Sequence, residues 1–187
     1  MTDFVAFPKI ARFNRDVVVT EKIDGTNAQI CINMGGEVFA GSRNRWIQPG
    51  NDNFGFAAWV EKHCEELLAL GPGRHFGEWW GQGIGRRYDQ TEKHFSLFNV
   101  GRWYDDHTPQ EFITEKMVQA PICCRTVPVL ATGTIEDATG RGMDKLRHDG
   151  SQAAPGFERP EGVITFHTGN GAMFKHTFEQ VHGKHAA

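Results

Sequence analysis

Residues 20–28, TEKIDGTNA, hold a lysine, an aspartate and a glycine at the close spacing Lys22-x-Asp24-Gly25. A lysine amine that has lost its proton is a nucleophile able to attack phosphorus, and a following glycine lets the backbone approach a ligand closely. Taken alone, this short motif fits a surface lysine at a turn at least as well. Other residues must decide between the two interpretations.

Five more short motifs follow Lys22 along the chain: SRNR at 42–45, FGEWWG at 76–81, HFSLFNV at 94–100, EGVI at 161–164 and MFKHTF at 173–178. Each has a structural alternative when it is considered alone, such as a solvated basic strand, a hydrogen-bonded carboxylate at a strand edge, or a core phenylalanine. Their fixed order makes coincidence a poor explanation. The residues they single out are Arg43, Glu78, Phe98, Glu161 and Lys175.

In this order the motifs resemble those of the covalent nucleotidyltransferase superfamily of polynucleotide ligases and RNA capping enzymes. VVTEKIDGTNA is most similar to the first motif of the RNA ligase 2-like branch, with Glu21 before the nucleophilic Lys22 and Asn27 five residues after it. The resemblance runs from about Pro8 to Phe178. It implies an α+β fold, an antiparallel-sheet-rich nucleotidyltransferase domain of the ATP-grasp-like ligase kind with flanking helices.

The resemblance also implies a role for each matching residue. Lys22 would carry the nucleotide, Glu161 would bind the metal, and the nucleotide-binding residues would be Glu21, Asn27, Arg43, Glu78, Phe98 and Lys175. Within that set, Phe98 matches the aromatic residue whose ring stacks on the purine. Glu78 matches the carboxylate that accepts a hydrogen bond from a ribose hydroxyl. The fifth motif departs from the family pattern of Lys-x-Lys, because Lys175 is its only lysine, so one phosphate contact is missing or is supplied from elsewhere.

The implied activity is that of an ATP-dependent RNA ligase with a covalent lysyl-AMP intermediate at Lys22, joining 3′-hydroxyl to 5′-phosphate ends. ATP is the nucleotide and Mg²⁺, or Mn²⁺, is the metal, which suits oxygen ligands. The expected partner is nucleic acid, RNA in preference to DNA, together with an accessory protein that helps to bind the ends. Three alternatives stay open: a DNA ligase, a GTP-using capping enzyme, and a non-catalytic nucleic-acid-binding homologue.

Length and composition set wider bounds. The 187 residues predict one nucleotidyltransferase domain over 1–187 without a C-terminal OB-fold, and the formal net charge of −3 excludes a strongly basic chain. No apolar run is long enough to span a membrane and no signal peptide opens the chain, which predicts a cytoplasmic protein without a membrane partner. The four cysteines form no CxxC pair and the nine histidines form no HExxH motif, so we expect reduced thiols and no structural zinc.

Local patterns predict the elements that must position these residues. Strands are expected at 16–20, 27–33, 74–80, 94–101, 161–167 and 171–178, and helices at 53–70, 109–119 and 136–148, the last weakened by glycine. Asn53 is the expected cap of the first helix. GQGIG at 81–85 predicts a turn, the Arg86-Arg87 pair an exposed basic site, and 148–162 a mobile loop.

Overall fold

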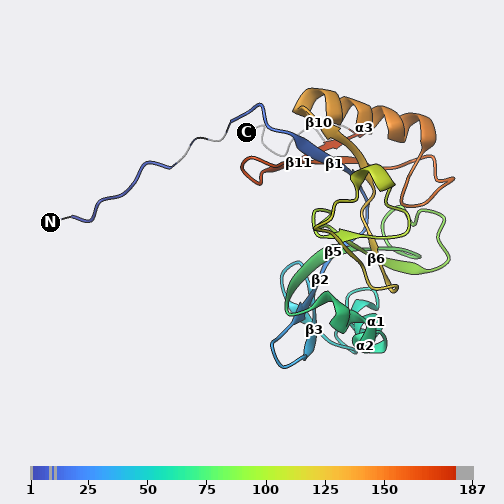
Figure 1. Cartoon of the computed structure of the whole chain (residues 1–187). Coiled ribbons are helices and arrows are strands. Elements are labelled where there is room, and N and C mark those ends of the chain that lie inside the picture. The colour runs from blue at the N-terminus through green and yellow to red at the C-terminus, as the bar shows by residue number, and fades with distance from the viewer. Residues whose placement is uncertain (1, 9, 11, 180–187) are drawn as a thin grey trace, which may run out of the picture.

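A computed structural model describes residues 2–8, 10 and 12–179, and it confirms the α+β class, with mainly antiparallel sheets and few helices (Figure 1). Two sheets make up most of it. A four-stranded sheet has the order β10-β1-β11-β12, and a six-stranded sheet has the order β4-β3-β2-β5-β6-β9. In this part of the chain, no helix has the length and apolar character needed to cross a membrane.

The four-stranded sheet is antiparallel throughout and is covered on one face by a helix (Figure 1). Valines alternate along its central strand, so that Val17 and Val19 pack against the helix with Leu146. The elements are β1 (Val17–Lys22), β10 (Val129–Gly133), α3 (Ile135–Asp149), β11 (Gly162–His167) and β12 (Met173–Thr177).

The six-stranded sheet carries the largest apolar cluster, which includes Ile30, Phe56 and Trp79 and lies between the sheet and its short helices. All neighbouring strands are antiparallel except β6 and β9, which are parallel. The elements are β2 (Thr26–Ile32), β3 (Val38–Ser42), β4 (Trp46–Ile47), α1 (Phe56–Lys62), α2 (Cys64–Leu67), η1 (Leu68–Leu70), β5 (Gly73–Gly81), β6 (Lys93–Leu97) and β9 (Cys124–Thr126).

A third cluster joins the regions near the end of β1. Ile23 follows β1 directly and packs with Trp80 of β5, the ring of Tyr88 and Phe157. Trp80 and Tyr88 meet edge to face with centroids 5.3 Å apart. The chain therefore passes from one sheet to the other through a packed interior, which fixes the end of β1 relative to β5.

The helix expected over 53–70 starts later and is broken. It begins at Phe56, and the preceding Gly55 has a left-handed backbone with φ of 82°. Asn53 is not the side-chain cap; the carboxylate of Asp52 accepts the N–H groups of Ala57 at 2.7 Å and Ala58 at 3.0 Å. The helical turn after His63 is a separate short helix, α2.

The helix expected over 109–119 is wrong. Only a 3₁₀ turn, η2 (Gln110–Phe112), forms there, and the end of the segment becomes β8 (Val118–Gln119), which pairs in parallel with β7 (Trp103–Tyr104). The Val118 N–H donates to the carbonyl of Arg102 at 2.8 Å. Pairing with a distant strand has overridden the local pattern.

Three further expectations are corrected. The strand expected over 94–101 ends at Leu97, and the glycines expected to weaken α3 leave it continuous from Ile135 to Asp149. The segment after α3, up to β11, is a loop as expected, but it is packed against the protein instead of mobile, because its Ser151, Ala154 and Phe157 are buried. Strands β9 and β10 were not among the strands expected from the sequence.

Two glycines of α3 form a matched pair for testing the packing of the four-stranded sheet. A Cβ at Gly142 would lie 2.7 Å from Val19 Cγ1, whereas a Cβ at Gly140 would meet nothing within 4 Å. We expect Gly142→Ala to lower the free energy of unfolding by about 1–2 kcal/mol, since overpacking outweighs the gain in helix propensity. Gly140→Ala should raise it by up to about 1 kcal/mol, as chemical denaturation would measure. Equal stabilisation by both variants would contradict the packing described.

Candidate active site

Lys22 is the last residue of β1, and it pairs with Gly162, the first residue of β11. This register brings Glu161 beside it although 139 residues separate the two in sequence. The Lys22 Nζ lies 2.5 Å from Glu161 Oε2, and the two side chains are 24% and 20% exposed. The proposed nucleophile and the proposed metal ligand therefore form an ion pair that solvent and ligands can reach.

The Asp24-Gly25 step that follows Lys22 is held tightly against β5 and the turn after it. A Cβ at Gly25 would lie 2.5 Å from the carbonyl oxygen of Trp79, so no larger residue fits without displacing the backbone. The Asp24 carboxylate accepts the N–H of Arg86 at 3.1 Å, and the Asp24 N–H donates to the Tyr88 hydroxyl at 2.8 Å. These contacts fix where β1 ends and β2 begins.

Glu78 of β5 lies at the centre of a hydrogen-bonded group on the six-stranded sheet. Its carboxylate accepts the Gly25 N–H at 3.1 Å and the Asn27 amide at 3.0 Å. The Asn27 carbonyl in turn accepts the Nε of Arg43 at 3.0 Å. Burial raises the pKa of Glu78 to about 7, although the Asn27 hydrogen bond and the nearby Lys22 charge act to lower it.

Phe98 follows directly after β6, and its N–H donates to the carbonyl of Phe76 at 2.9 Å. The residue is 41% exposed, so it does not belong to the core. Glu78 pairs with Ser96, two residues before Phe98, which puts Phe98 on the same face of the sheet as Glu78. An exposed ring on that face is free to stack on a ligand.

Lys175 lies on β12 and pairs with Ile164, which pairs on its other side with Thr20. Directly paired residues present their side chains on one face of a sheet, and Thr20 and Lys22 share a face because they are two residues apart. The register therefore puts Lys175 on the same face of the four-stranded sheet as Lys22, on the outer strand.

Glu21 is arranged differently from the other predicted site residues. Its buried carboxylate accepts the Ser151 hydroxyl at 2.6 Å and the N–H groups of Gln152 at 2.8 Å and Ala153 at 2.9 Å. Burial raises the pKa of Glu21, and these three hydrogen bonds act in the opposite direction. Glu21 is thus hydrogen-bonded to the segment that leads to Glu161. A contact between Glu21 and a nucleotide stays a prediction.

Sequence reasoning named Asp24 and Arg86 without their role in supporting the site, and it missed Tyr88. Arg86 does not belong to an exposed basic pair, because it lies near Asp24, with Nε 3.6 Å from Oδ2, and binds Glu179 at 2.8 Å. Tyr88 is buried within three consecutive residues of positive φ, from 51° to 62°. The glycine-rich turn at 81–85, just before Arg86 and Tyr88, was the sequence signal that could have drawn attention to these two residues.

The family model for RNA ligase matches residues 15–177, which include every site residue predicted from the sequence. The chain belongs to the RNA ligase family. No curated protein matches the chain closely enough to count as a relative.

The fold of this RNA ligase family member is similar to that of solved Naegleria gruberi RNA ligase structures. A mutant with ATP and Mn aligns with a TM-score of 0.60 and 17% identity, covering 88% of this chain and 49% of that one. The enzyme with PPi gives 0.55 and 18%, and a mutant with AMP and Mn gives 0.54 and 17%; each covers 88% of this chain and 50% of the other. The chain thus spans about half the length of these ligases.

The raised pKa of Glu78 makes the stability of this RNA ligase family member depend on pH. In the unfolded chain Glu78 ionises near 4.5, whereas in the folded protein it holds its proton to about pH 7. The ionisation of Glu78 therefore lowers the free energy of unfolding as pH rises between these two values. We expect Glu78→Gln to gain stability relative to the parent protein over this range, by on the order of 3 kcal/mol at pH 8 compared with pH 4.

The control for this experiment is Glu158→Gln at an exposed carboxylate, which should leave the profile unchanged. Thermal or urea unfolding at a series of pH values provides the measurement. A Glu78→Gln profile that runs parallel to that of the parent protein would show that burial does not perturb this carboxylate.

Proposed function

We propose that this chain is the catalytic unit of an ATP-dependent RNA ligase, in which Lys22 accepts AMP and the ligase joins a 3′-hydroxyl to a 5′-phosphate. The observation that carries the proposal is the ion pair of Lys22 with Glu161. It lies close to Glu78, whose pKa responds to the charges of both residues. An amine nucleophile, an acidic group and a hydrogen-bonded carboxylate are what the first step requires.

In that step the Lys22 Nζ attacks the α-phosphorus of ATP. A nitrogen–phosphorus bond forms, the bond from the α-phosphorus to the bridging oxygen breaks, and pyrophosphate leaves with the electron pair. The amine must first give up a proton, and Glu161 Oε2, at 2.5 Å, is within hydrogen-bond reach to accept it. The product is a lysyl-AMP phosphoramidate on Lys22.

The residues around Lys22 fit a divalent cation with oxygen ligands. Glu161 offers carboxylate oxygens at a partly exposed position, and this is the donor type that Mg²⁺ and Mn²⁺ prefer. When bound, the metal would supply positive charge to stabilise the phosphates in the transition state. Lys175 and Arg43 add positive charge from the protein, and Phe98 offers its exposed ring to the purine.

The comparisons favour ATP and RNA over the alternatives. Naegleria gruberi RNA ligase structures of the same fold hold ATP and Mn, AMP and Mn, or PPi. These are the substrate, the transferred group and the leaving group of the proposed first step. Family membership favours RNA as the polymer. Because the chain spans half of those ligases, we propose that a further end-binding protein or segment assists sealing.

All four cysteines are free thiols, which fits a reducing compartment, and we propose a cytoplasmic role in RNA repair.

The first step can be tested by incubating the protein with α-labelled ATP and Mg²⁺ or Mn²⁺. We expect an acid-labile label that survives denaturing electrophoresis, and none in Lys22→Ala. Lys175→Ala should slow labelling by on the order of 10²-fold, because one charge that stabilises the transition state is lost. Lys62→Ala, at an exposed helix end, is the control and should label like the parent protein.

An adduct that persists in Lys22→Ala would overturn the assignment of the nucleophile. Labelling by GTP in preference to ATP would replace the ligase with a capping activity. A second assay offers RNA and DNA ends with 3′-hydroxyl and 5′-phosphate groups; sealing of DNA alone would contradict the choice of RNA.

A further inference from the structure

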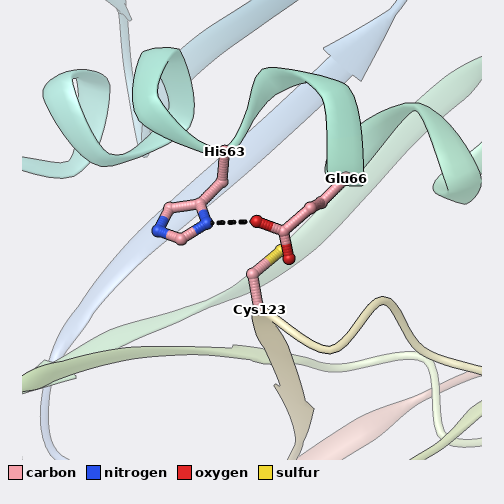
Figure 2. Close-up of side chains that lie close together, drawn as sticks. All are labelled: His63, Glu66 and Cys123. Atoms are coloured by element: carbon pink, nitrogen blue, oxygen red, sulfur yellow. Dashed lines mark hydrogen bonds and ion pairs between the residues drawn. The ribbon is translucent and has the colours of Figure 1, made fainter.

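A second group of ligating side chains lies beside the short helices of the six-stranded sheet (Figure 2). His63 stands at the junction of α1 and α2, Glu66 is in α2, and Cys123 directly precedes β9. The imidazole nitrogen, a carboxylate oxygen and the thiol sulfur all lie within 4.8 Å of one another. Three different donor types therefore converge from two separate segments.

We propose that His63, Glu66 and Cys123 form a binding site for one Zn²⁺ ion, a structural site independent of nucleotide transfer. Nitrogen, oxygen and sulfur donors together suit a borderline-soft cation and not Mg²⁺, which takes oxygen ligands. Zinc binds imidazole at about 2.0–2.1 Å, carboxylate at about 2.0–2.2 Å and thiolate at about 2.3 Å in tetrahedral geometry.

The positions of the three side chains require only small adjustments to reach such geometry. Tetrahedral bonds of those lengths put neighbouring ligand atoms roughly 3.3–3.6 Å apart. His63 Nδ1 and Glu66 Oε1 are now 2.7 Å apart in a hydrogen bond, and zinc would enter between them. The spacing of three residues puts both on one side of a helical turn.

The surroundings hold two of the three ligands in place. The His63 ring packs against the indole of Trp59 with centroids 5.0 Å apart, and Cys123 packs against the apolar cluster of the six-stranded sheet. Glu66 is the most exposed member, at 42% of its side chain, and so the fourth position faces solvent and would hold water. Cys124 is buried on the sheet, with its sulfur 4.0 Å from that of Cys123.

The cluster is separate from the proposed active site. Trp79 of β5 faces the apolar cluster that Trp59 and Cys123 also join, whereas Glu78, the next residue along the strand, faces the other side. A metal at His63, Glu66 and Cys123 would thus tie the helical segment to the start of β9 across the edge of the core. Its effect would be on stability.

Cobalt is a suitable probe because Co²⁺ replaces Zn²⁺ and reports thiolate ligation by its absorption. Titrating the reduced full chain with Co²⁺ should produce a sulfur-to-cobalt charge-transfer band that saturates at one equivalent and is abolished by Zn²⁺. Cys123→Ser should lose the band. Cys31→Ser and Cys64→Ser, at half-buried thiols outside the cluster, should retain it.

His63→Ala and Glu66→Gln keep the thiol and test the other two ligands. Each should weaken Zn²⁺ binding by more than the roughly 10- to 100-fold that loss of an outer-sphere partner costs. Zn²⁺ should also raise the melting temperature of the parent protein and not that of either variant. Because these residues are partly exposed, both variants should fold even if Cys123→Ser does not.

Absence of the band at one equivalent of Co²⁺, its persistence in Cys123→Ser, or unchanged zinc affinity in both His63→Ala and Glu66→Gln would overturn the proposal. Labelling of Lys22 by ATP does not enter these measurements, so failure of the zinc site and failure of the ligase assignment are distinguishable.

Discussion

The close approach of Gly25 to β5 is the constraint on which the arrangement of the site depends. A Cβ at this position would lie 2.5 Å from the Trp79 carbonyl, so only glycine allows β2 to begin there. As a result the chain leaves the four-stranded sheet at Lys22 and reaches the six-stranded sheet at Thr26, four residues later. Lys22 belongs to one sheet and the Glu78 hydrogen-bonded group to the other, and this short crossing holds them together.

Two buried carboxylates flank the crossing, and both are energetically expensive. Burial raises the pKa of Glu21 and of Glu78, which means that the ionised form of each is disfavoured in the folded protein. The protein offsets this cost with hydrogen bonds, from Ser151 and two backbone N–H groups to Glu21 and from Gly25 and Asn27 to Glu78. These hydrogen bonds also fix the positions of the two carboxylates, so the residues around Lys22 are held rigidly.

The predictability of each feature from sequence follows the range of the interactions that produce it. Lys22, Glu78 and Glu161 were identifiable because the short motifs that contain them follow one another in the order found in the family, although no single motif decides. The helix expected over 109–119 failed because pairing between β7 and β8 outweighed local periodicity. The loop within 148–162 was expected to be mobile, but Glu21, 130 residues away from Ser151, accepts a hydrogen bond from it and holds it in place.

Arg86 shows why the remaining contacts were beyond local inference. Its backbone N–H binds Asp24, and its guanidinium reaches the carbonyl of Arg159 at 3.4 Å and the carboxylate of Glu179 at 2.8 Å. Arg159 lies two residues before Glu161, and Glu179 lies two residues after the end of β12. One side chain therefore links the segment after Lys22 to both sides of the β11–β12 pair that carries Lys175. An arginine next to a glycine-rich turn suggests a phosphate contact, yet here its charge is used within the protein, unlike the charges of Lys22, Arg43 and Lys175, which we propose to act on the nucleotide.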